Sequence, residues 1–128
     1  MPIVDAPRRL NVLHIEDSDL DHQLMLTQMR RAGLEVQAQR VESADGFEAA
    51  LRHGHHGASW DVILSDYNLP GFSGLVALEM LKARGATTPF IIVSGEIGED
   101  TAVAAMRNGA ADYLLKNNLA RLVPAMLH

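Results

Sequence analysis

The sequence predicts a doubly wound α/β fold, a sandwich in which helices cover both faces of a parallel five-stranded sheet. Five short apolar runs alternate along the chain with five segments of helical spacing, the order that produces parallel strands. The runs at 61–65 and 89–94 have unbroken apolar centres, as strands buried on both faces do. The run at 35–41 alternates apolar and polar residues, which is typical of an edge strand.

Each predicted strand is one of these apolar runs, and a helix follows it. The strands are expected at 10–15, 35–41, 61–65, 89–94 and 111–115. The helices are expected at 19–32, 44–53, 74–84, 100–108 and 119–127. No linker or repeat divides the chain, so we expect one domain over 9–128, preceded by a tail at 1–8.

Local signals set the ends and the buried sides of the helices. Ser43 is a predicted N-cap, because its hydroxyl can accept a hydrogen bond from the first turn of the helix at 44–53. Glycines follow the other ends, at Gly33, Gly54, Gly85 and Gly109. Apolar spacing predicts these core residues, in chain order: Met25, Met29, Phe47, Leu51, Leu75, Leu78, Leu81, Val103, Met106, Leu122 and Met126.

An edge position for the second strand fits the strand order 2-1-3-4-5 of flavodoxin-like folds. In that order the ligand crevice lies at the carboxyl ends of the first and third strands. The residues there are Glu16 and Asp17 after the first strand, Asp66 after the third, Ser94 at the end of the fourth and Lys116 after the fifth. We expect these five side chains to converge, without a contribution from the edge strand.

This set of side chains predicts phosphoryl transfer with a metal ion. Three carboxylates repel one another, so a cation or a proton must compensate their charge. Oxygen ligands with open positions suit Mg²⁺, and a carboxylate beside that ion can attack phosphorus and become an acyl phosphate. Asp66 is therefore the predicted phosphoryl acceptor. Lys116 would hold one phosphoryl oxygen by charge, and Ser94 would donate a hydrogen bond to another.

The chain strongly resembles the receiver domains of two-component response regulators. The resemblance rests on the five dispersed residues Glu16, Asp17, Asp66, Ser94 and Lys116 and on three sequence segments, "SDYNLPGFSG", "IIVSG" and "NGAADYLLK". The resemblance covers about residues 9 to 127. It implies Mg²⁺-dependent phosphoryl transfer to Asp66 from a histidine kinase or a histidine phosphotransfer protein. It also implies metal binding by the carboxylates of Glu16, Asp17 and Asp66 and by the backbone carbonyl of Asn68.

The resemblance further implies a switch made of Ser94 and Tyr113. In such domains phosphorylation draws the hydroxyl residue toward the phosphoryl group and lets the aromatic ring turn inward. The change would reshape the face of the fourth helix, fifth strand and fifth helix, and so control binding of a downstream output protein, a fused domain or a second copy of the chain.

Three departures from the family pattern concern the site and the end of the chain. The longer Glu16 replaces the commoner aspartate, and we expect it to reach the metal through a water molecule. Asn117 stands where many receivers have a proline after the lysine, so the path of that loop is open. Pro124 fits the last helix only if it lies in the first turn, where its missing N–H is not needed.

Four further polar residues have separate expectations. Glu96 and Asn68 each lie two residues beyond a site residue, so both are predicted to border the path of an attacking water and to set the acyl phosphate lifetime. His14 is expected inside the first strand as a hydrogen-bonded structural residue. His22 is expected to be exposed on the first helix.

Composition excludes several other classes of protein. With a net charge of −5 and no basic stripe, the chain is not expected to bind nucleic acid directly. It has no apolar run long enough to span a membrane, no secretory signal and no cysteine, which together predict a cytoplasmic protein without membrane insertion.

Two alternatives to a phosphorylated signalling domain remain open at this point. A degenerate receiver would act as a binding or dimerisation module without phosphorylation, although such forms usually lose the acidic residues. A phosphohydrolase could use Asp66 as its nucleophile, but "SDYNLPG" lacks the second aspartate that would act as general acid. We therefore expect a signalling domain rather than an enzyme.

Overall fold

The computed structural model describes residues 9–96 and 98–127, and it confirms the predicted fold. Five parallel strands form one sheet in the order β2-β1-β3-β6-β7, with β2 at an edge as predicted. Their bounds are β1 Arg9–Ile15, β2 Glu35–Val41, β3 Val62–Ser65, β6 Phe90–Ser94 and β7 Asp112–Leu115. The predicted tail at 1–8 lies outside the described residues.

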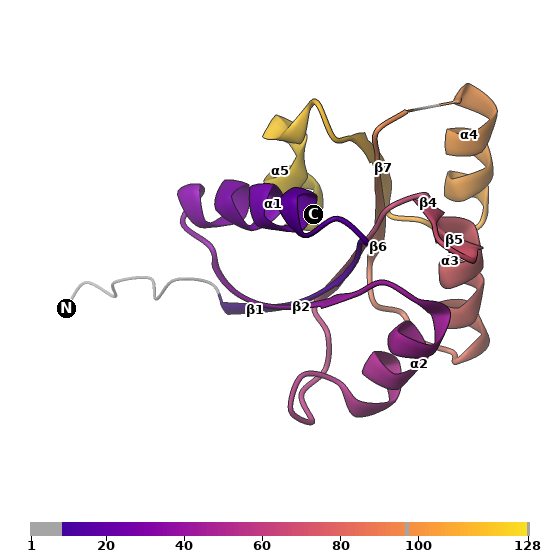
Figure 1. Ribbon diagram of the computed structural model, residues 1–128, viewed down its shortest axis with the longest axis horizontal. Helices are drawn as coiled ribbons and strands as arrows, with labels where there is room; N and C mark the ends of the chain where they lie inside the picture. The colour runs from indigo at the N-terminus through magenta and orange to yellow at the C-terminus, as the bar shows by residue number, and fades with distance from the viewer. Residues whose placement is uncertain (1–8, 97, 128) are drawn as a thin grey trace.

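Helices cover both faces of the sheet (Figure 1). Helices α1 and α5 lie on one face, and α2, α3 and α4 lie on the other. Their bounds are α1 Asp19–Arg31, α2 Ala44–His53, α3 Gly74–Ala83, α4 Glu99–Arg107 and α5 Leu122–Met126. Within the described residues no helix combines the length and the apolar character needed to cross a membrane.

Alternation along each strand divides the core into two apolar clusters. In β1, Leu13 and Ile15 pack with α2 and α3, while Val12 packs with α1 on the opposite face. In β3, Ile63 and Leu64 divide in the same way. Strands that bury both faces need apolar residues at successive positions, which explains the unbroken apolar centres of β3 and β6.

Serine caps fix the starts of three helices that lead away from the sheet. Ser43 accepts a hydrogen bond from Gly46 N at 3.0 Å, as predicted, and Ser73 accepts one from Val76 N at 3.2 Å. Ser18 caps α1 in the same way, through Asp21 N at 3.2 Å. Because Ser18 follows the acidic pair directly, this cap also fixes the orientation of the loop that carries the pair.

The predicted core side of α4 is wrong. Val103 and Met106 are 44% and 47% exposed, whereas Ala105 is fully buried and Ala102 packs against the core. The sequence prediction assigned the larger apolar side chains of α4 to the core because of their hydrophobicity. In the structure the small alanine side chains face the sheet instead. The consequence is that α4 presents two apolar side chains to solvent.

The C-terminal segment is only partly the predicted helix. A 3₁₀ turn, η1 Leu119–Arg121, precedes the short helix α5. Pro124 is the third residue of α5, so it lies in the first turn, where its missing N–H leaves no acceptor unpaired. The expected position of Pro124 is confirmed. After Lys116 the chain turns back, with Asn118 N donating to Leu115 O at 3.0 Å.

Candidate functional site

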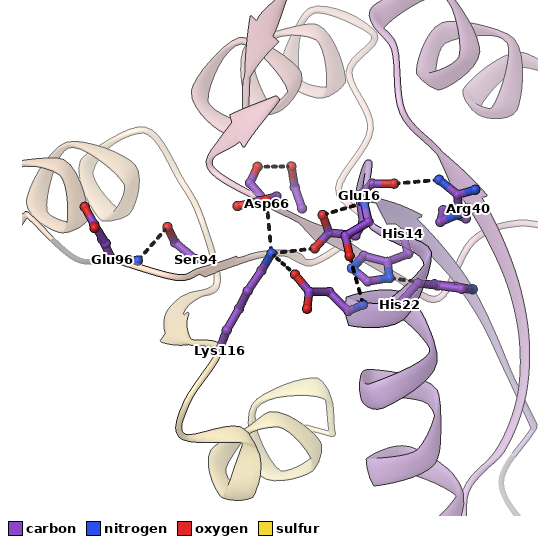
Figure 2. A network of polar contacts seen from close by, with 11 residues as sticks. His14, Glu16, His22, Arg40, Asp66, Ser94, Glu96 and Lys116 are labelled. Carbon is purple, nitrogen blue, oxygen red and sulfur yellow. Dashed lines mark hydrogen bonds and ion pairs between the residues drawn. The ribbon is translucent and has the colours of Figure 1, made fainter. Parts of the chain in front are cut away.

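The polar side chains predicted at the crevice come from the carboxyl ends of four neighbouring strands. Backbone hydrogen bonds continue past the strand ends and hold three of these residues. Glu16 N donates to Val41 O at 2.9 Å, Asp66 N to Ile15 O at 2.9 Å, and Lys116 N to Ser94 O at 2.8 Å. Each site residue is thus fixed to the neighbouring strand, and the side chains gather at one edge of the sheet (Figure 2).

Glu16, Asp17 and Asp66 form an acidic cluster whose carboxylate oxygens lie within 4.8 Å of one another. The side chain of Glu16 is 1% exposed and that of Asp66 is 13% exposed, while Asp17 faces solvent. Such a graded set of hard oxygen donors suits Mg²⁺, which takes a few carboxylates and keeps waters on its open side. Buried Glu16 Oε1 has the ammonium group of Lys116 as its partner, at 2.7 Å.

Lys116 places one positive charge among several carboxylates (Figure 2). Its Nζ lies 2.7 Å from Glu16 Oε1, 2.7 Å from Asp21 Oδ2 and 3.1 Å from Asp66 Oδ2. The contacts to Asp21 and Asp66 are hydrogen bonds, and the contact to Glu16 is an ion pair. Burial disfavours the ammonium charge, but the three carboxylates outweigh it and raise the pKa of Lys116.

Burial raises the pKa of Glu16 to about 7. Loss of hydration is the largest cause, and the charge of Asp66 acts in the same direction. Lys116 and the Ser18 N–H, which donates to Glu16 Oε2 at 3.2 Å, oppose the rise. The site therefore holds a carboxyl group that gives up its proton at higher pH than an ordinary glutamate. A bound cation would favour its charged form.

Sequence reasoning missed two residues of this network, Arg40 and Asp21. Arg40 lies on β2, the edge strand that was expected not to contribute, and its guanidinium donates to the backbone carbonyl of Glu16 at 3.1 Å. The expectation for the edge strand was wrong, because a long side chain reaches beyond its own strand end. Asp21 comes from the first turn of α1, and no sequence signal near it indicated a contact with Lys116.

The expectation that His22 is exposed was also wrong. His22 is buried under α1, and its Nδ1 lies 2.7 Å from Nδ1 of His14. One ring must donate and the other accept, so the accepting imidazole is neutral. Burial lowers the pKa of His14 to about 3 and also lowers that of His22. The predicted structural role of His14 agrees with this buried hydrogen bond.

Ser94, Glu96 and Tyr113 are linked to one another by hydrogen bonds. Ser94 is buried and accepts a 3.4 Å hydrogen bond from Glu96 N, while the Glu96 side chain faces solvent. Tyr113 is buried in the inward position, where its hydroxyl lies 3.5 Å from the Glu96 carbonyl oxygen. Burial raises the pKa of Tyr113, so the phenol remains a hydrogen-bond donor.

Asn68 lies in a small hairpin that the sequence did not predict. Strands β4 Asn68–Leu69 and β5 Phe72–Ser73 pair antiparallel, and Gly71 adopts φ 81° in the turn between them. Helix α3 then begins at Gly74, whose N–H donates to Tyr67 O at 2.8 Å. A Cβ at Gly74 would lie 2.7 Å from the Asp66 carbonyl oxygen, so only glycine lets the helix begin this close to the acceptor loop.

Comparison with known families places this geometry in context. The family model described as "Response regulator receiver domain" matches residues 12–127. Two-component system protein A of Emericella nidulans is 32% identical over 112 residues, which are 87% of this chain and 16% of that protein. Transcriptional regulatory protein FixJ of Azorhizobium caulinodans is 35% identical over 110 residues, which are 86% of this chain and 49% of that protein.

The chain therefore spans less than half the length of these two relatives. Among solved structures, a response regulator receiver domain protein from Clostridium thermocellum superposes with a TM-score of 0.79 at 24% identity, covering 92% of this chain and 91% of that one. At that identity the superposition supports the fold alone. It agrees with the strand order and the two helical layers described above.

Proposed function

Because the chain belongs to the family of response regulator receiver domains, we propose that it is a phosphoacceptor signalling switch whose acceptor is Asp66. The phosphoryl group would come from a histidine kinase or a histidine phosphotransfer protein. An Asp66 oxygen attacks the phosphorus, the bond from phosphorus to the donor imidazole breaks, and that imidazole leaves with the electron pair. The product on this chain is an acyl phosphate, which is a signalling state rather than a released product.

One observation carries this proposal: the Asp66 carboxylate belongs to an acidic cluster that fits a divalent cation and also accepts a hydrogen bond from the ammonium group of Lys116. Glu16, Asp17 and Asp66 would hold Mg²⁺ through carboxylates, with Glu16 acting through water, and Asn68 would add its backbone carbonyl. When bound, the ion supplies positive charge for the phosphoryl oxygens. Lys116 holds another of these oxygens, and Ser94 donates its hydroxyl proton to a third.

The signal would leave the site through Ser94 and Tyr113. Ser94 is linked to the loop before α4 by its contact with Glu96 N, and the Tyr113 hydroxyl contacts the carbonyl of the same residue. A shift of Ser94 toward a phosphoryl group would therefore move this loop and the face made by α4, β7 and α5. The exposed Val103 and Met106 on α4 favour a partner on this face, either an output protein, a fused domain or a second copy of the chain.

The first experiment measures intact mass after incubation with acetyl phosphate, with and without Mg²⁺, for wild type and Asp66→Ala. We expect a gain of one phosphoryl group that needs Mg²⁺ and is lost in the variant. A gain that persists in Asp66→Ala would contradict the assignment of the acceptor. If wild type gains nothing even when quenched within seconds, the protein is a phosphorylation-independent module. Steady release of phosphate with many turnovers would instead favour a phosphohydrolase.

Glu96 and Asn68 are expected to set the lifetime of the acyl phosphate, because both lie on segments that border Asp66. We expect Glu96→Ala and Asn68→Ala to change the rate of phosphoryl loss by about threefold or more, since each alters the position of an attacking water. The rate is followed by mass after the donor is removed. Glu99→Ala, on the solvent side of α4, serves as a control. Unchanged rates in both variants would refute this role.

A further inference from the structure

The resting position of Lys116 raises a question about phosphoryl binding. In the unphosphorylated protein its ammonium group lies closer to Asp21, at 2.7 Å, than to the acceptor Asp66, at 3.1 Å. Asp21 belongs to α1 and is 95 residues away from Lys116 in the sequence. It is not in the acidic cluster that fits the metal ion. The role of this fourth carboxylate is therefore separate from metal binding.

The structure holds Asp21 in place from several sides. Its backbone N–H donates to the Ser18 hydroxyl at 3.2 Å, and Ser18 N in turn donates to Glu16 Oε2 at 3.2 Å. The next residue, His22, is fixed to His14 of β1 by the buried Nδ1–Nδ1 contact of 2.7 Å. These contacts set the rotation of the first turn of α1, and the carboxylate of Asp21 lies within hydrogen-bond distance of the lysine.

We propose that Asp21 is a positioning residue that holds the Lys116 ammonium group in the resting state and releases it when Asp66 is phosphorylated. This inference rests on the proposed function. Asp21 thus competes with the phosphoryl group for Lys116. It slows phosphoryl uptake and shortens the lifetime of the acyl phosphate.

The burial of the carboxylates around Lys116 identifies the contact that is released most easily. An ammonium group has three protons, and three carboxylates already surround that of Lys116. A phosphoryl oxygen on Asp66 is a further partner for the same charge, so it competes with the carboxylates of Glu16 and Asp21. The Glu16 side chain is 1% exposed and cannot regain hydration, whereas that of Asp21 is 33% exposed and can. Release of Asp21 therefore has the smallest desolvation cost.

The variant Asp21→Asn keeps the size of the side chain but removes its charge. The amide holds the ammonium group less strongly, and it repels neither an incoming phosphodonor nor the phosphoryl oxygens. We expect uptake from acetyl phosphate to become about fivefold faster, and phosphoryl loss to slow by a similar factor, as befits a partly exposed charged hydrogen bond. Asp21→Glu, which restores the charge, should return both rates toward those of wild type.

Asp19→Asn is the matched control, because Asp19 lies in the same first turn of α1 and its side chain is 68% exposed. It removes the same charge without touching Lys116, so uptake should stay within about twofold of wild type. If Asp19→Asn accelerates uptake as much as Asp21→Asn, general charge repulsion explains the effect and the inference is overturned. Equal rates for wild type and Asp21→Asn overturn it as well.

Lysine-selective ¹³Cε NMR tests the contact itself without any phosphodonor. The chain has two lysines, so the spectrum contains Lys116 and one internal reference, Lys82, which is exposed on α3. Asp21→Asn should move the Lys116 signal and leave Lys82 unchanged, and Asp19→Asn should move neither. If the Lys116 signal does not move in Asp21→Asn, the inference about Asp21 is overturned, while the proposed function is not affected. If Asp21→Asn moves the Lys116 signal but the wild-type protein gains no phosphoryl group, the proposed function is overturned. The kinetic role of Asp21 is then overturned with it.

Discussion

Replacing Lys116 with methionine is expected to lower the free energy of unfolding by about 3 kcal/mol at pH 8, because it leaves buried carboxylates without their compensating charge. The side chain of Lys116 is 22% exposed, and that of Glu16, its most buried partner, 1%. Methionine preserves much of the side-chain length, so lost packing contributes little. The unfolding transition can be followed in urea through the fluorescence of the single tryptophan, Trp60, which is buried against α2.

The cost of losing Lys116 should depend on pH and on Mg²⁺. The pKa of Glu16 is about 7, so this group is mostly protonated at pH 5. A neutral carboxyl group is stabilised less by the positive charge of Lys116. We therefore expect a smaller loss at pH 5 than at pH 8, and partial recovery at pH 8 when Mg²⁺ is added. Lys82→Met changes an exposed lysine and should leave stability within about 0.5 kcal/mol of wild type. Equal stability of Lys116→Met and wild type at pH 8 would contradict the charge balance described here.

The second large effect is acid destabilisation through His14. Its pKa is about 3 in the folded protein and 6.5 ordinarily, so the unfolded chain binds more protons between these values. The stability that His14 contributes is fully present above pH 6.5 and is lost progressively as the pH falls toward 3. The full effect of this shift is about 5 kcal/mol, as an upper bound. His22, whose pKa is also lowered by burial, acts in the same direction.

Glu16 has the opposite linkage. Its pKa rises from 4.5 to about 7 on folding, so the folded protein binds the extra proton, and stability falls as the pH rises through this range. Between about pH 4.5 and 6.5 the contributions of Glu16 and His14 oppose each other. We expect stability to change little there and to fall steeply below pH 4.5, where only the histidine contribution remains.

Urea unfolding from pH 4 to 8 separates the two groups. His14→Gln keeps a hydrogen-bonding side chain next to His22 but cannot take up a proton, so the loss of stability in acid should be reduced. Its remaining stability should fall as the pH rises from 4.5 to 7, and Mg²⁺ should suppress that fall by favouring charged Glu16. His53→Gln, at the exposed end of α2, is the control. If His14→Gln loses as much stability as wild type when the pH falls to 4, groups other than His14 control acid unfolding.

The main features of the site were predictable because they depend on chain direction. Parallel strands all end at the same edge of a sheet, so residues that follow successive strands must gather there. The sequence therefore determined that Glu16, Asp17, Asp66, Ser94 and Lys116 converge. It also favoured the observed strand order, since the alternation of 35–41 fits an edge position.

Contacts made across elements were not predictable in this way. The pair formed by Asp21 and Lys116 depends on how far α1 is rotated about its axis, and the contact from Arg40 to Glu16 depends on the reach of one side chain. Helical spacing says which residues share a side of a helix but not which side meets the sheet. In α4 the small Ala105 is buried, whereas Met106 is exposed.

The sequence by itself thus determined the fold and the composition of the acidic site. Only the tertiary structure decided which groups surround Lys116, that His22 is buried against His14, and that α4 presents apolar side chains to solvent. The physical reason is that strand order and strand ends follow from local patterns in the chain. Side-chain contacts between elements depend on rotation and packing distance, which are settled only when all the elements pack together.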